Sequence, residues 1–294
     1  MDLNYLVMVL FLILGTCANL PFFVRSIRDT FCSSAKFSKT PAAPSALLTT
    51  SLAELMWVLP CFVQCAIQLF NGDGPWSPGA SKTGCDVMGL YSVFASIAGM
   101  TSTLWVAMLT VRSLTGRAPY TAKHGALVGV AIFIVSALFA ALPVMGVGSF
   151  HYTGEGFCYI DFRNTPQTLI LLLITLPTVV ATIGLLSYAL KVGGWPSQLD
   201  LYIMAGGFLS AWTLWVPACL MGLAGASFPR GFFISGGIMG HLQALINPYI
   251  YGIRWRSSVL AMEDGAGVKK MAVTPDATEL GATPAQAAVL ASPV

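Results

Sequence analysis

The sequence predicts an all-α membrane protein, a bundle of seven transmembrane helices with its N-terminus outside and its C-terminus in the cytoplasm. The first observation is composition: 56% of the 294 residues are hydrophobic and only 9% are charged, whereas a soluble domain carries about 25% charged residues. The second is a mean hydropathy of +0.75. So few charged side chains cannot cover a water-soluble fold, which excludes a soluble enzyme, a nucleic-acid-binding protein and a disordered chain.

The third observation is a set of seven apolar windows, each long enough for a membrane-spanning helix, which needs about 20 residues. Six of the windows contain no charged residue, and the second contains only Glu54. Lipid offers no partner for backbone amides, so each window is expected to be helical. In chain order the windows are 3–24, 45–70, 87–111, 125–150, 165–190, 201–229 and 231–253.

The ends of the windows carry further signals. The first window is expected to stay as a helix, because Arg25 and Arg28 follow the apolar run, whereas the basic residues of a signal peptide precede it. Residues 76–79 and 193–196 are rich in Gly and Pro and predict turns. Segment 263–294 is rich in Ala, Pro, Thr and Gly and is expected to be a disordered cytoplasmic tail that follows a folded domain, 1–262.

Basic residues set the predicted orientation, because cytoplasmic loops carry an excess of Lys and Arg. With the N-terminus outside, twelve of the fifteen basic residues fall in the inner segments. The outer loops then hold only Lys82, Arg163 and Arg230. This distribution predicts a multi-pass membrane protein, in contact with membrane lipids, whose C-terminus lies in the cytoplasm.

Cysteines and glycines predict two kinds of contact. Of the seven cysteines, only Cys85 and Cys158 fall on the outer side, where oxidising conditions favour a disulfide that would pin the second outer loop as a lid. The alternative is two unpaired thiols. Glycines in the sixth and seventh windows predict close helix packing in lipid; they are Gly206, Gly207, Gly236, Gly237 and Gly240.

Several motifs resemble those of the rhodopsin-like G-protein-coupled receptors. The seventh window contains Asn247, Pro248 and Tyr251 in the Asn-Pro-x-x-Tyr spacing, and the sixth contains Trp215 and Pro217 in the Trp-x-Pro spacing. Segment 140–161, with its Leu-Pro-x-x-Gly-x-Gly run followed by Cys158, is similar to the prostanoid receptors. The resemblance implies a short amphipathic eighth helix over 254–262 and, as partners, a heterotrimeric G protein and a small lipophilic ligand.

The sequence also departs from that pattern. The seventh window lacks the arginine with which prostanoid receptors hold the ligand carboxylate, and Ile238 stands at that position. The acidic-Arg-Tyr triplet at the inner end of the third helix reads Val111, Arg112 and Ser113. In this loss of family motifs and in its very short N-terminal segment, the sequence resembles receptors captured by large DNA viruses. That resemblance implies a location in the plasma membrane, here the membrane of the host cell.

The single acid within the windows, Glu54, must face the bundle interior, be protonated or bind a cation, because an ionised carboxylate in lipid is costly. The resemblance implies polar neighbours for it; they are Asn19, Thr101, Gln243 and Asn247. Three interpretations stay open: a buried polar network that rearranges on activation, a sodium site, and a structural protonated acid. No cofactor and no other metal site is expected.

Arg112 has two interpretations. The first is a positive anchor whose side chain reaches the lipid–water boundary. The second, implied by the resemblance, is contact with a G protein. The neighbouring Val111 cannot restrain Arg112 as an acid would, so high basal signalling is a hypothesis.

The sequence predicts a ligand pocket that suits a neutral small molecule or lipid. The residues expected in it are Met100, Phe157, Trp212 and His241. Trp215 and Pro217 are expected to form a hinge beneath it, and Pro248 to permit a kink in the seventh helix. Plain packing remains the alternative for the tryptophans, and a core position for His241.

The predicted function is signalling across the membrane through G proteins, and the sequence contains no catalytic set. Two alternatives remain. One is a receptor-derived protein that does not signal and instead traps ligands or partners with other receptors. The other is a seven-helix transporter, which a single intramembrane acid argues against.

Overall fold

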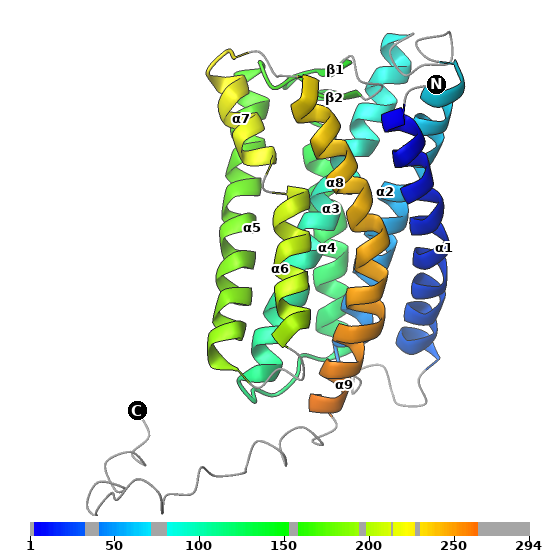
Figure 1. Cartoon of the computed structure of the whole chain (residues 1–294). Helices are drawn as coiled ribbons and strands as arrows, with labels where there is room; N and C mark the ends of the chain where they lie inside the picture. The colour runs from blue at the N-terminus through cyan, green and yellow to red at the C-terminus, as the bar shows by residue number, and fades with distance from the viewer. Residues whose placement is uncertain are drawn as a thin grey trace, which may run out of the picture.

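The long helices form a bundle in which their axes are roughly aligned (Figure 1). A short β-hairpin lies at one end of the bundle and a short helix, α9, lies at the other. The computed structural model describes residues 3–32, 41–71, 81–152, 158–193, 198–212, 214–226 and 230–263. We refer below to the hairpin end and the α9 end of the bundle. The predicted tail, 263–294, lies outside the described residues apart from Glu263, the last residue of α9.

Helices account for most of the described chain. In order they are α1 (Leu3–Phe31), α2 (Ala43–Asn71), α3 (Lys82–Leu114), α4 (Ala122–Ala140), α5 (Thr165–Val192), α6 (Gln198–Trp212), α7 (Trp215–Leu223), α8 (Arg230–Tyr249) and α9 (Arg256–Glu263), with a π-helix, η2 (Ile250–Trp255), between the last two. The strands are β1 (Phe150–Tyr152) and β2 (Cys158–Ile160).

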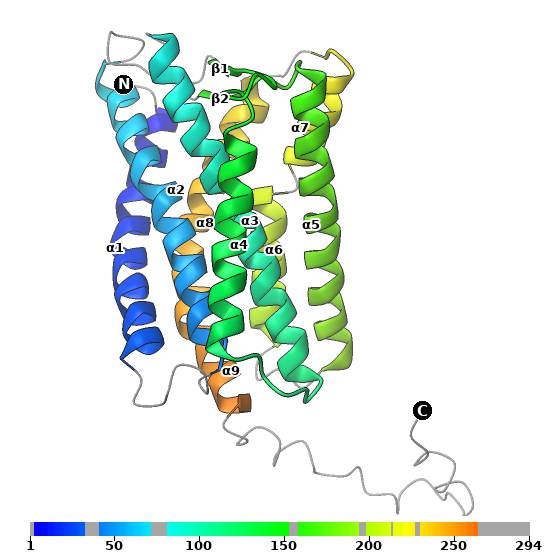
Figure 2. The ribbon, with the colours of Figure 1, turned by 180° about the vertical axis from the view of Figure 1, so that it is seen from behind.

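Six helical stretches in the described part of the chain are long and apolar enough to cross a membrane: α1 to α5, and α6 with α7 as one stretch, Gln198–Leu223. They are consistent with a multi-pass membrane protein. The α8 helix lies in the same bundle, packed against α1, α2 and α6. Seen from behind, α4 lies across α3 between α2 and α5 (Figure 2).

Four of the predicted windows, the first three and the fifth, correspond to helices that extend them by a few residues. The fourth window was too long: α4 ends at Ala140, and the chain then passes through turns to β1. Pro143 cannot continue a regular helix, and Gly146 and Gly148 adopt φ angles of +84° and +90°, which favour glycine. The sixth window divides into α6 and α7.

Helix α8 departs from the prediction at its end, where it widens into η2, directly after Pro248. A π-turn is rare, and it often lies at a functional site. The expected eighth helix is present as α9, which begins two residues later than predicted.

The predicted glycines differ in their packing: an added Cβ would lie 3.7 Å from Leu214 at Gly236 and 3.7 Å from Trp57 at Gly240, which are ordinary contacts. An added Cβ at Gly206 or Gly207 would meet nothing within 4 Å, so the prediction of close packing there is wrong. The closest approaches are elsewhere. A Cβ added to Gly129 would overlap Thr49, where α4 packs against α2, and a Cβ added to Gly222 of α7 would overlap the Phe162 carbonyl. Which glycine faces a neighbour depends on the rotation of each helix about its axis, which composition does not give.

Candidate functional site

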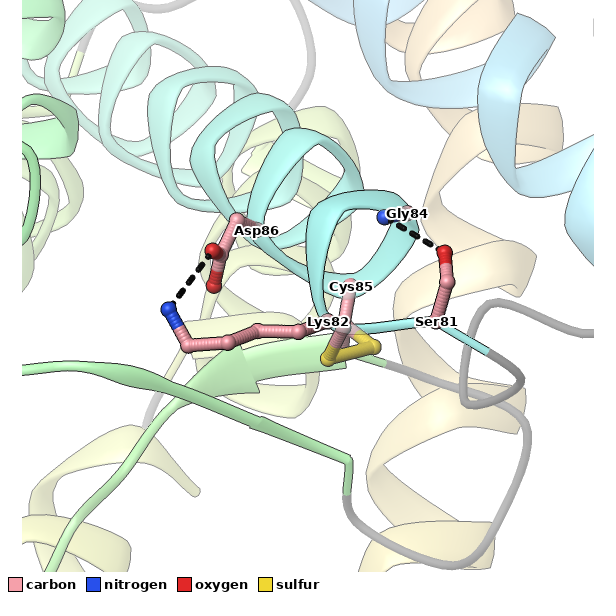
Figure 3. Close-up of a disulfide and its surroundings, with 6 residues drawn as sticks. Ser81, Lys82, Gly84, Cys85 and Asp86 are labelled. Carbon is pink, nitrogen blue, oxygen red and sulfur yellow. Dashed lines mark hydrogen bonds and ion pairs between the residues drawn. A yellow bond between two sulfur atoms is a disulfide. The ribbon is translucent and has the colours of Figure 1, made fainter.

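The β-hairpin is fastened to the start of α3. Its strands pair antiparallel, with Phe150 opposite Ile160 and Tyr152 opposite Cys158. Cys158 forms a disulfide with Cys85, so the predicted bridge is confirmed (Figure 3). Ser81 begins the helix there by accepting a hydrogen bond from the Gly84 N–H at 3.0 Å, which fixes the turn that carries Cys85 (Figure 3).

The hairpin contributes an aromatic side chain to the interior. Tyr159 is buried and stacks on Trp215 of α7, with 4.5 Å between ring centroids, and more loosely on Phe162. Burial raises the pKa of the Tyr159 hydroxyl, which bonds to Ser96, and so keeps it neutral. The covalent bridge and this stack together hold the hairpin over the bundle.

Beneath the hairpin lies a cavity of about 100 Å³ between α2, α3, α6, α7 and α8. Aromatic and small apolar residues dominate its walls, and among the described lining residues there is no Asp, Glu, Lys or Arg. The residues that line it include Trp57, Cys61, Ser92, Tyr159, Trp212, Trp215, Phe232, His241 and Gln243. The indole N–H of Trp212 has no hydrogen-bond partner in the described part of the chain.

Two of the four predicted pocket residues, Trp212 and His241, line this cavity. Met100 is instead buried in the cluster that packs behind Trp212. Phe157 lies outside the described residues. Sequence reasoning missed Trp57, although it lies three residues after Glu54 and therefore on the same, inward face of α2.

One direct side-chain bond joins two members of the predicted polar network. Asn247 of α8 donates from Nδ2 to Glu54 Oε1 of α2 at 2.5 Å, and both side chains are buried. Thr101 is not in this contact, because its hydroxyl donates to the Ile97 carbonyl at 2.6 Å within its own helix. Gln243 is buried and faces the cavity.

Asn19 has a different role from the one expected. Pro248 has no N–H, so it leaves the carbonyl of Ala244, four residues earlier, without its helical donor. Asn19 of α1 supplies that donor from Nδ2 at 2.7 Å, and also bonds to the Gly15 carbonyl. Asn19 thus satisfies the backbone group that Pro248 frees, whereas Asn247 bonds to Glu54.

The α9 end of the site is organised around η2. Tyr251 is buried there, with its hydroxyl bonded to Thr103 and close to Glu54. Trp255 is fully buried and donates its indole N–H to Thr110 of α3 at 2.7 Å. Trp255 lies among basic residues in the sequence, and no pattern there marked it as a core residue.

Arg112 lies in the last turn of α3. Its Nε donates to the Ala118 carbonyl at 2.7 Å, and its guanidinium lies 3.9 Å from the centre of the Tyr120 ring. The side chain has no carboxylate partner among the described residues. A cation–π contact and a carbonyl therefore fix Arg112 where the sequence had suggested no restraint.

Two ion pairs that the sequence did not suggest join elements at the α9 end. Asp200 of α6 accepts from Arg254 Nε of η2, at 3.0 Å to Oδ1 and 3.2 Å to Oδ2. Arg256 of α9 pairs with Asp29 of α1, at 2.6 Å between Nη2 and Oδ2.

No model of a known protein family matches the chain, and no curated protein matches it.

Proposed function

We propose that the protein is a seven-helix receptor of the rhodopsin-like class, with prostanoid-like features in its middle third, that signals through heterotrimeric G proteins. The α8–η2 segment is the proposed seventh span. The hairpin end faces outside and the α9 end faces the cytoplasm, at the plasma membrane. The ligand is a small, neutral, lipophilic molecule, because the cavity is apolar and its described walls carry no carboxylate or basic counter-charge.

The observation that carries the proposal is that one continuous segment makes polar contacts from the cavity to the α9 end of the bundle. Along α8 and η2, His241 and Gln243 line the cavity, Asn247 bonds to Glu54, and Arg254 pairs with Asp200. A shift of this segment that favours one occupant of the cavity would also change the contacts at the α9 end.

In the proposed mechanism, a ligand binds more tightly to a second arrangement of α6, α7 and α8 and so raises its population. Trp212 and Trp215, on either side of the interruption between α6 and α7, contact the ligand and move with it. Separation of Asp200 from Arg254 then opens a cleft beside α3, where a G protein contacts Arg112.

A second candidate is a receptor-derived protein that binds ligand or other receptors without activating G proteins. The state of Arg112 favours it, because the guanidinium is already held by the Ala118 carbonyl and the Tyr120 ring. The residues beside Arg112 favour it as well, because Val111 and Ser113 stand where the receptor triplet has an acid and a tyrosine.

Basal signalling separates the two candidates. We expect cells that display the full chain to produce second messenger without added ligand, and we expect Arg112→Ala to reduce this signal to background. The matched control is Lys123→Ala, which removes an exposed basic residue of α4 at the same end and should leave the signal unchanged. Surface display is measured for each variant, across G-protein families. A wild-type signal at background that Arg112→Ala does not change contradicts basal signalling and favours the second candidate.

A further inference from the structure

A second cavity lies at the α9 end, away from the apolar pocket. It has a volume of about 350 Å³ and lies between the last turns of α3 and α5 and the segment that follows α3. Since a single water needs about 10–15 Å³, there is room for a large polar group. The lining residues are Met108, Val111, Arg112, Thr115, Arg117, Tyr120, Leu185 and Tyr188.

The charge of this cavity is positive and uncompensated. Arg112 and Arg117 both line it, and neither pairs with a carboxylate among the described residues. Two acids at this end of the bundle, Asp29 and Asp200, already bind other arginines. A negatively charged group is therefore the complementary occupant.

One of the two arginines is already positioned to bind such a group. Arg112 uses Nε for the Ala118 carbonyl and its ring-facing surface for Tyr120, which leaves its terminal N–H groups for an acceptor. A planar guanidinium held in this way suits the paired oxygens of a phosphate. Arg117 also lines the cavity, and its side chain is exposed. It therefore adds a second positive charge without a fixed side-chain position.

The other walls identify where the negative group comes from. Met108, Leu185 and Tyr188 provide an apolar side, and the side chains of Met108 and Tyr188 are 39% and 47% exposed on the outside of the bundle. They belong to α3 and α5, two of the helices that are apolar enough to cross a membrane. Arg112 lies in the last turn of α3, and an arginine at the end of a membrane-spanning helix reaches toward the lipid headgroups.

We propose that this cavity binds the phosphate-bearing headgroup of an anionic phospholipid, whose acyl chains lie along α3 and α5 beside Met108 and Tyr188. The site goes beyond the proposed receptor function and needs neither the ligand nor a G protein. It takes one element from that proposal: with the α9 end in the cytoplasm, the cavity opens to the leaflet that is rich in anionic lipid.

The test is lipid binding to the full chain purified in detergent, measured by native mass spectrometry. The probes are a phosphatidylinositol bisphosphate and, as the uncharged reference, phosphatidylcholine. We expect the anionic lipid to bind preferentially, and Arg117→Ala to weaken its binding about fivefold, which corresponds to about 1 kcal/mol for one basic residue at a membrane surface. Arg117→Lys keeps the charge and should retain most of the affinity.

The control variant is Lys123→Ala, which removes a positive charge at the same end but outside the cavity. An equal loss in Lys123→Ala and Arg117→Ala would overturn the proposal, because the attraction would then be unspecific. Equal affinity for the two lipids would overturn it as well. If a soluble inositol phosphate competes as well as the lipid does, the cavity is a site for free phosphate compounds, and the proposal of a lipid site is overturned. None of these outcomes depends on the signalling assay, so the two proposals fail separately.

Discussion

At the scale of single residues, the best-defined feature is the pair of Glu54 and Asn247. Both side chains are buried, and their bond joins α2 to α8 across the interior. A buried polar group that loses its only partner costs about 1–3 kcal/mol, and more if it is charged. The pair therefore resists any substitution that removes only one of its members.

We expect Asn247→Leu to lower the thermal unfolding midpoint by several degrees, because it leaves the Glu54 carboxyl without its amide donor. Glu54→Gln should cost less, since an amide oxygen still accepts from Asn247. The double variant Glu54→Leu with Asn247→Leu should be more stable than Asn247→Leu alone. The measurement is thermal unfolding of purified protein, with Glu54→Leu, Asn247→Leu and the double variant compared in a double-mutant cycle. Strictly additive effects of the two single changes would contradict a direct pair.

The sequence predicted which polar residues matter more reliably than it predicted their partners. Glu54 was expected to face inward because a carboxylate in contact with lipid is energetically costly, and Glu54 is indeed buried. No sequence pattern fixes where a hydroxyl points, so Thr101 bonds to its own helix. Asn19 bonds to the carbonyl that Pro248 releases, a contact between residues 225 positions apart along the chain.

At the scale of elements, the interruptions of α6 and α8 set the shape of the site. A proline removes a helical hydrogen bond to the residue four positions earlier. Pro217 lies in the first turn of α7, which follows α6, and Pro248 precedes the π-helix. The sequence predicted a hinge at Pro217 and a kink at Pro248. It did not predict a π-turn, because the path that the chain takes after an interruption depends on the neighbours available, here Phe22 against Gly252 and Thr110 against Trp255.

The ion pair between Asp200 and Arg254 holds α6 against η2. We expect Asp200→Asn to raise amide hydrogen exchange in the first turns of α6 by about two- to fivefold, because a partly exposed ion pair contributes up to about 1 kcal/mol. Arg254 is 43% exposed, whereas Asp200 is 6% exposed. The measurement is hydrogen exchange read by mass spectrometry.

The matched control for that pair is Arg256→Ala, which breaks the second ion pair of this end but touches α1 instead of α6. It should leave exchange in α6 unchanged. Under the proposed function, Asp200→Asn should also raise basal signalling, whereas Arg256→Ala should not. Equal exchange in the wild type and Asp200→Asn would show that the pair does not restrain α6.

At the scale of the whole molecule, composition predicted most of the helical content because lipid leaves the backbone few other choices. The β-hairpin was not predicted, since the apolar run over 141–150 looked like a continuation of α4. Only local geometry at Pro143, Gly146 and Gly148 turns that run away from the helix. The cavity near Arg112 was not predicted either, because it is formed by α3, α5 and a loop that are separate in sequence.

The seventh crossing is the whole-molecule prediction with the clearest test. An epitope tag at each terminus should be detected on opposite sides of the plasma membrane, with the N-terminal tag accessible in intact cells and the C-terminal tag only after permeabilisation. The physical reason is the excess of basic residues in the segments placed inside. Detection of both tags on one side would mean an even number of crossings and would rule out the receptor.

The bond between Cys85 and Cys158 also constrains how the chain is threaded. Both sulfur atoms must end in one compartment, so the stretch between them, which contains α3 and α4, has to traverse the bilayer an even number of times. A chain that inserted α3 but left α4 behind would separate the two thiols by the thickness of the membrane. Formation of the bridge thus excludes molecules in which one of the two helices crosses the bilayer and the other does not.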